Sequence, residues 1–170
     1  MPVDPHQDPR PPARVLFNPE YIRMNADLRN AVRVSSRKVG AEDITDAWQA
    51  AEWHDIPDLN LTGLNLQVAD HVTFLAALPC IGTNRVAYSM QDNWVCRQYA
   101  LAFASVVSAF LAVNVGIVCD ESGHHMYNWI PLHTDGKVKA YIVEPQLDEI
   151  VVHLNPQHHY VGKTGFALVV

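Results

Sequence analysis

Residues 99–113 contain no charged side chain, and this run is the feature that most constrains the fold. A membrane-spanning helix needs about 20 apolar residues, so a shorter run directly after Arg97 and Gln98 predicts a helix buried in a protein core. We expect it to extend over about 93–115, capped by Asp92 or Asn93 and stopped by Gly116. Its apolar side chains lie on nearly every face, which favours burial on several sides.

The residues before this helix predict further helices. A proline-rich, flexible arm over 1–13 is followed by Asn18-Pro19, which is typical of a helix start, and apolar residues at helical spacing predict helices over about 19–33, 41–53 and 68–78. Residues 35–40 would break the first helix, and residues 80–88 would form a connector. Leucines alternate with other residues over 59–66, and this pattern is compatible with either a short hairpin or a packed loop.

Patterns of period two dominate the rest of the chain. They predict strands over 117–120, 124–132, 137–144, 150–154 and 166–170, with Asp135-Gly136 among the turns between them. We therefore expect an α+β fold, in which a helical N-terminal half with a central buried helix packs on an antiparallel β-sheet. A chain of 170 residues, 49% of them hydrophobic, fits one domain, which we place at 14–170.

Composition argues against several classes of function. The net charge is −6 and no extended Lys/Arg cluster is present, so neither nucleic acid nor a membrane is an expected partner. The N-terminal arm lacks an apolar stretch and does not predict a signal peptide. The three cysteines, Cys80, Cys96 and Cys119, are a poor disulfide framework, which favours a cytoplasmic or otherwise intracellular, reducing compartment.

Cys96 falls in the first turn of the central helix. Unpaired backbone amides and the helix dipole stabilise an anion at this position, which lowers the pKa of a thiol and raises its thiolate fraction. The alternative is a buried cysteine that serves as a small apolar residue. The position in the first turn, outside the apolar body of the helix, favours a nucleophile.

The predicted hairpin brings a histidine and a carboxylate together. If Asp135-Gly136 is a two-residue turn, His125 lies opposite Gln146 and diagonal to Glu144; if the loop has four residues, His125 lies opposite Glu144 itself. Either loop places His125 and Glu144 on one face of adjacent strands. A three-residue loop would shift the register by one and bring in His124 instead. We prefer His125.

Cys96, His125 and Glu144 form a candidate catalytic triad. Cys96 would attack an acyl carbon, and His125 would take the thiol proton and later protonate the leaving group. Glu144 would hold the imidazole tautomer and stabilise its cationic form.

Neighbouring residues complete the predicted site. The oxyanion would be bound by the Cys96 amide and one side chain, for which Gln91 is preferred to Asn93, and Trp94 would border the substrate. Adjacent histidines invite a metal interpretation, but no C-x-x-C or H-x3–5-H spacing supports it, and adjacent strand residues point to opposite faces. We expect no metal site.

Three segments around these residues resemble papain-like cysteine peptidases: Cys-Arg-Gln-Tyr-Ala at 96–100, Gly-His-His-Met-Tyr-Asn at 123–128 and Ile-Val-Glu-Pro-Gln at 142–146. The nearest pattern is the protease-like C-terminal domain of the mushroom agglutinins, which are chimerolectins. The resemblance covers roughly residues 88–150. It implies a papain-like fold, and it carries Cys96, His125 and Glu144 over as the triad.

The chain also departs from that family. The resemblance points to calcium as a cofactor, held partly by an acidic pair after the cysteine, but Arg97-Gln98 stands at that place. We therefore expect no cofactor. The preceding residues show no β-trefoil repeats, so the family's lectin half is not implied.

We expect, on this basis, a cysteine peptidase-like hydrolase that performs acyl transfer on a peptide or amide substrate. Two alternatives remain open. One is a non-peptidase thiol enzyme with the same triad, such as a cell-wall amidase or a transglutaminase, which only a substrate panel separates from a peptidase. The other is a catalytically silent binding module on the same fold, for which Cys96 would be unreactive.

Overall fold

The computed structural model describes residues 26–51, 58–61, 65–85, 95–151 and 164–169. Four α-helices are present in these ranges: α1 (Ala26–Ser35), α2 (Ala41–Gln49), α3 (His71–Ala77) and α4 (Cys96–Val106). Two 3-10 turns, η3 (Leu78–Cys80) and η4 (Thr83–Arg85), follow α3, and a π-helical turn, η5 (Val107–Leu111), extends α4. The strands are β1 (Arg37–Gly40), β2 (Asp58–Leu61), β3 (Asn65–Asp70), β4 (Gly116–Asp120), β5 (His125–Thr134), β6 (Lys137–Glu144), β7 (Glu149–Val151) and β8 (Gly165–Val169). The fold is α+β, as predicted.

The strands form one mixed sheet. Its order is β1-β3-β5-β4-β8-β2, and β6, which lies off this path, pairs with both β5 and β7. The pairs β3·β5 and β2·β8 are parallel, whereas the remaining pairs are antiparallel. The predicted sheet was purely antiparallel, which is wrong because β2 and β3 of the N-terminal half pair in parallel with β8 and β5.

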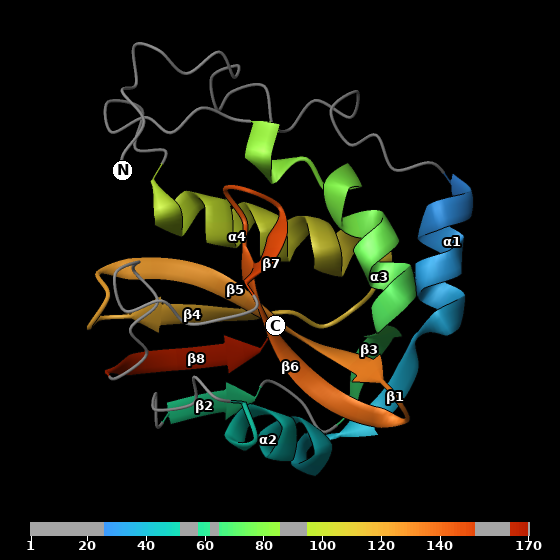
Figure 1. Cartoon of the computed structure of the whole chain (residues 1–170), viewed down its shortest axis with the longest axis horizontal. Helices are drawn as coiled ribbons and strands as arrows, with labels where there is room; N and C mark the ends of the chain where they lie inside the picture. The colour runs from blue at the N-terminus through green and yellow to red at the C-terminus, as the bar shows by residue number, and fades with distance from the viewer. Residues whose placement is uncertain (1–25, 52–57, 62–64, 86–94, 152–163, 170) are drawn as a thin grey trace.

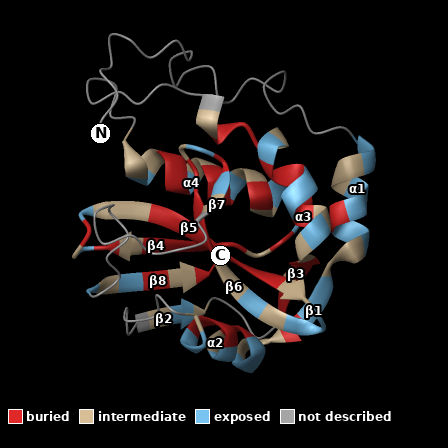
Figure 2. Ribbon diagram, viewed as in Figure 1, coloured by how far each residue is buried: buried red, intermediate tan, exposed pale blue. Residues whose placement is uncertain are grey.

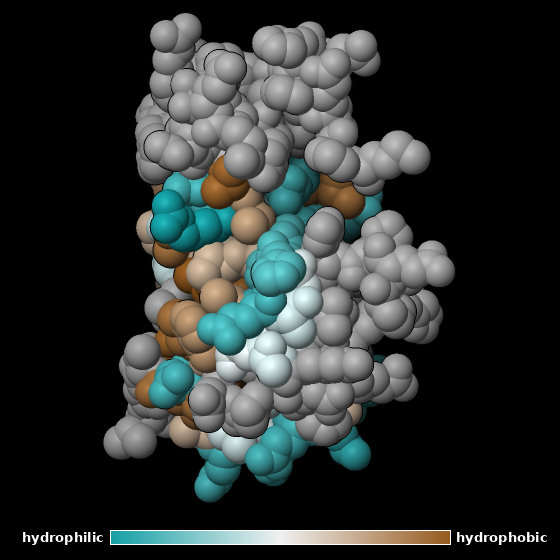
Figure 3. Space-filling view, turned by 90° about the vertical axis from the view of Figure 1, so that its left-hand side faces the viewer, coloured by the Kyte–Doolittle hydropathy of each residue, from teal (hydrophilic) through white to brown (hydrophobic). Residues whose placement is uncertain are grey.

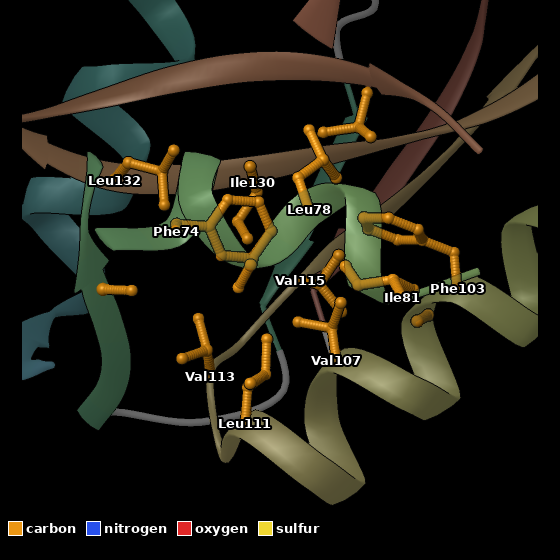
Figure 4. Packing of buried hydrophobic residues seen from close by; sticks show 14 of the residues in the cluster. Phe74, Leu78, Ile81, Phe103, Val107, Leu111, Val113, Val115, Ile130 and Leu132 are labelled. Atoms are coloured by element: carbon orange, nitrogen blue, oxygen red, sulfur yellow. The ribbon is translucent and has the colours of Figure 1, made fainter. Parts of the chain in front are cut away.

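Helices cover both faces of the sheet (Figure 1). α1, α3 and α4 lie on one side and α2 lies on the other, and Figure 2 shows that the buried residues gather between these layers. In Figure 4, Phe74 and Leu78 from the α3 region approach Phe103, Val107 and Leu111 of α4 and η5. On the other face, Trp48 of α2 packs on Trp129 of β5, with ring centroids 4.8 Å apart.

The central helix is shorter than predicted. Residues 93 and 94 lie outside the described ranges, the N-cap is Val95, and Cys96 is the first helical residue. The chain leaves the helix at Ala112, which adopts a left-handed φ of 54°, and Gly116 is already in β4. Gly116 is needed there for another reason, since a Cβ at this position would overlap the Trp129 indole. One stripe of α4 that includes Leu101 is open to solvent, so the helix is not buried on every side.

Several predictions for the N-terminal half are wrong. No strand was predicted at residues 37–40: α1 does end at Ser35, as expected, but these residues then form β1, which pairs with β3. Residues 68–70 belong to β3, and α3 begins only at His71, where the Asp70 side chain accepts the Thr73 N–H. The segment 59–66 is not a hairpin, since β2 pairs with β8 while β3 pairs with β1 and β5. The arm over 1–13 lies outside the described residues.

The hairpin of β5 and β6 has the two-residue turn considered from the sequence. Thr134 pairs with Lys137, and Asp135 and Gly136 have positive φ values of 54° and 78°. Such angles are typical of the turn whose twist matches antiparallel strands. The register predicted for this turn is therefore confirmed, and it fixes which residues of β5 and β6 share a face. Within the described ranges, no helix is both long enough and apolar enough to cross a membrane.

Candidate active site

The Cys96 thiol lies at the N-terminus of α4. Val95 is extended, with φ −120° and ψ −179°, and its N–H donates to the Gln98 side chain at 3.3 Å. The chain therefore turns sharply into the helix at Cys96. A residue in this first turn lies at the positive end of the helix dipole, where backbone amides lack intrahelical acceptors.

His125 is the first residue of β5 and directly follows a tight turn. The buried Asp120 carboxylate organises this turn by accepting hydrogen bonds from the Gly123 N–H at 2.8 Å and the Ser122 hydroxyl at 2.6 Å. His124 completes the turn with a φ of 49° and is exposed. Asp120 pairs with His125 across β4 and β5, so the turn fixes where the imidazole enters the site.

Glu144 ends β6 and lies against the imidazole. Its Oε2 atom is 2.8 Å from His125 Nε2, and its Oε1 atom accepts the Gln146 N–H at 3.0 Å. The side chains of His125 and Glu144 are only 9% and 5% exposed, so water screens this interaction weakly. Since Nε2 faces the carboxylate, Nδ1 is the ring nitrogen left for the thiol.

The thiol of Cys96 completes the chain of contacts. It hydrogen-bonds the His125 ring and accepts the backbone N–H groups of Met126 and Arg97. Burial alone raises the pKa of the Cys96 thiol, but these hydrogen bonds and the charge of His125 outweigh burial, and the pKa falls below its usual value.

The pKa of the His125 imidazole is shifted in the opposite direction, upward. Burial lowers the pKa of His125, but hydrogen bonds and negative charge from Cys96 and Glu144 outweigh it and raise the pKa to about 9. Both shifts favour a proton on the ring and a negative charge on the sulfur. A thiolate–imidazolium pair supported by a carboxylate is an activated nucleophile with its own proton donor.

Not every predicted site residue can be placed. Gln91, Asn93 and Trp94 lie outside the described residues, so the predicted oxyanion side chain and substrate border stay predictions. Cys96 is the first helical residue, and the role of its backbone amide as an oxyanion donor also stays a prediction. Arg97, which stands where the acidic pair of the mushroom agglutinins was expected, is exposed. Among the residues described, no group of three or more His, Cys, Asp or Glu side chains could hold a metal ion.

Asn128, the last residue of the 123–128 motif, helps to position the helix that carries Cys96. Its side-chain amide donates to the Ala100 and Gly116 carbonyls, both at 3.0 Å. These bonds attach α4, one turn beyond Cys96, to the sheet that carries His125. An asparagine between the aromatic residues Tyr127 and Trp129 is the signal that could have identified it, because buried amides are usually hydrogen-bonded.

An apolar row begins beside the thiol. Met126 and Phe166 both pair with Cys119, from β5 and β8 respectively, so the three side chains share one face of the sheet. Phe166 is 37% exposed, and the Met126 backbone contacts Cys96. Figure 3 views the end of the molecule where α4, β5 and β8 begin, and it shows a hydrophobic strip beside hydrophilic side chains.

Comparison with solved structures identifies a shared fold. One match, described as "PSL1a-E64 complex", has a TM-score of 0.57 and 13% identity over 77% of this chain and 50% of the other. A second, Polyporus squamosus lectin bound to a human-type influenza-binding epitope, has a TM-score of 0.56 and 12% identity over 79% and 49%. No family model matches the sequence, and no curated protein is significantly similar to it.

The chain spans about half the length of both matched structures. At this identity the likeness concerns the fold, which this chain shares with part of a mushroom lectin. The comparisons therefore support a likeness in fold to a mushroom lectin, and the papain-like part of the predicted resemblance stays a prediction.

Proposed function

We propose that this protein is a cysteine-dependent hydrolase of papain-like fold that cleaves a peptide or amide bond by acyl transfer. The observation that carries the proposal is the continuous chain of contacts from the Cys96 thiol through His125 to Glu144. Each member has the environment that its role requires: a thiol at a helix start, a charged imidazole and a buried carboxylate.

In the acylation step, the Cys96 thiolate attacks the carbonyl carbon and a C–S bond forms. Negative charge develops on the carbonyl oxygen, where the backbone amide of Cys96 donates a hydrogen bond. The C–N bond then breaks, and the departing amine takes the proton of the His125 imidazolium. The product is a thioester on Cys96, and the imidazole is left neutral.

In the deacylation step, neutral His125 removes a proton from water as the water attacks the thioester carbon. The C–S bond breaks, a carboxylic acid leaves, and the thiolate–imidazolium pair is restored. Glu144 stays ionised throughout and keeps the Nε2 proton aligned. The apolar row of Met126, Cys119 and Phe166 offers a surface for an apolar part of the substrate.

Selective alkylation of Cys96 tests this proposal. The protein is treated at about pH 6.5 with iodoacetamide or with the thiol-directed epoxide E-64, and the modified residues are identified by peptide mass spectrometry. Because alkylation requires the thiolate, we expect Cys96 to react about 10- to 100-fold faster than an ordinary thiol. Cys80 and Cys119 are free and partly exposed, so they serve as internal controls.

Cys119 is an especially useful control because burial and nearby negative charge raise the pKa of its thiol. Labelling of Cys96 no faster than Cys80 would contradict the proposal. If Cys96 is labelled, a panel of peptides, amine acceptors and cell-wall peptides then separates a peptidase from a transglutaminase or an amidase.

A binding module without turnover is the second candidate. It is favoured by one observation, namely that the matched structures are those of a lectin and one of them holds a glycan. In that case Cys96 would react as an ordinary thiol, and Cys96→Ala would leave ligand binding unchanged on a glycan array. Loss of peptide hydrolysis on the same substitution would exclude this second candidate.

A further inference from the structure

Asp148 is a buried carboxylate that the proposed reaction does not use. It follows β6 by four residues, is only 4% exposed and adopts a left-handed φ of 51°. Its Oδ2 atom accepts the backbone N–H groups of Gly82 at 3.1 Å and Asn84 at 3.4 Å, and its Oδ1 atom accepts the Thr83 hydroxyl. One carboxylate thus holds three consecutive residues that lie more than sixty positions earlier in the chain.

Burying such a group is costly. Well-placed donors offset the removal of a carboxylate from water only in part. An apolar side chain at this position would leave the three donors of residues 82–84 without this acceptor, which is also unfavourable. The carboxylate and its donors therefore fix the position of the 145–148 turn relative to residues 82–84.

The geometry that Asp148 specifies is that of the turn behind Glu144. Within this turn the Gln146 N–H donates to Glu144 Oε1, and the Leu147 N–H donates to the Glu144 carbonyl at 3.1 Å. The Asn84 side chain adds a bond to the Leu147 carbonyl at 3.3 Å. The turn that aligns the Glu144 carboxylate is thus itself anchored to residues 82–84.

We propose that Asp148 is a positioning residue for the candidate active site. By anchoring the 145–148 turn to residues 82–84, it keeps the Gln146 N–H on Glu144 Oε1 and so holds Oε2 against His125. The inference rests on the proposed function, since it concerns the same triad. Without the anchor, Glu144 would align less well with His125, and the imidazolium that stabilises the Cys96 thiolate would weaken.

The test is the pH dependence of Cys96 alkylation by iodoacetamide, measured in the full chain. Asp148→Gly removes the carboxylate but tolerates the positive φ. We expect its alkylation profile to move to higher pH, so that Cys96 reacts about tenfold more slowly at about pH 6 than in the unchanged protein. Thr83→Val, which removes one donor, is expected to slow the reaction about threefold in the same direction.

A conservative variant of Asp148 should keep the alkylation profile of the unchanged protein. Asp148→Asn keeps an acceptor for the two N–H groups, and the Thr83 hydroxyl can reverse its role and accept from the amide. Asparagine also tolerates the left-handed backbone. We expect the alkylation rates of this variant to stay within about threefold of the unchanged protein.

Asp70→Ala provides the control for a merely structural effect. It removes the N-cap of α3, where Asp70 accepts the Thr73 N–H at 3.0 Å, and should lower the thermal unfolding midpoint while leaving the alkylation profile in place. An unshifted profile in both folded Asp148→Gly and Thr83→Val would overturn the inference. Slow alkylation of Cys96 in the unchanged protein would instead contradict the proposed function.

Discussion

Cys96→Ala is expected to abolish peptide or amide hydrolysis, lowering kcat/KM by about 1,000-fold or more. The reason is that the substitution removes the only atom that forms the covalent intermediate, while His125 and Glu144 keep their contact at 2.8 Å. Initial rates on the best substrate of the panel, measured with the purified variant, give this ratio.

Cys80→Ala is the matched control, because Cys80 is also free and partly exposed but lies in η3. It should retain the full rate. Hydrolysis that survives Cys96→Ala but is lost on Cys80→Ala would assign the nucleophile to a different residue.

Glu144→Gln is expected to move the alkaline limit of activity to lower pH. Amine departure needs a protonated His125, whose pKa of about 9 places this limit near pH 9. The Glu144 carboxylate stabilises the imidazolium, so its neutralisation lowers the pKa of His125 by about one to two units. Above neutral pH the imidazole then loses its proton at lower pH, and kcat/KM should fall where that of the unchanged protein does not.

The pH profile of kcat/KM measures this shift. Glu149→Gln is the matched control, since Glu149 pairs with Glu144 across β6 and β7 but is exposed. An alkaline limb that stays near pH 9 in Glu144→Gln would show that another group sets the protonation of His125.

The contact between His125 and Glu144 could be predicted because hairpin parity is a local property. The Asp135-Gly136 pair fixes a two-residue turn, and alternation along β5 and β6 then leaves no freedom in the register. The placement of Cys96 at a helix start was predicted for a similar reason, since the uncharged run begins directly after it.

The N-terminal half was harder to predict because its strands depend on distant partners. β1 is four residues long, and only its pairing with β3 makes it a strand. In the segment 65–70 the buried side chains of Leu66 and Val68 alternate with polar ones, which is typical of a strand. Its partner β5, however, lies more than sixty residues further along the chain. Such pairings leave little mark on local sequence.

The end of the central helix shows how tertiary packing overrides a local signal. Gly116 suggested a left-handed stop, but the chain already leaves the helix at Ala112 so that Val113 and Val115 can enter the core. Asn114 then fixes this exit through two hydrogen bonds with the Gln67 backbone, at 2.6 and 2.9 Å. Nothing near residue 114 in the sequence reveals that partner.

The central claim is that Cys96 exists as a thiolate paired with an imidazolium. Its most direct test is a titration of the thiolate ultraviolet absorbance, taken as the difference between the unchanged protein and Cys96→Ala. Because hydrogen bonds and the charge of His125 hold the pKa of Cys96 below its usual value, we predict that the thiolate signal rises at lower pH than that of an ordinary thiol. A signal that rises only near the ordinary thiol pKa of about 8.5 would contradict the account.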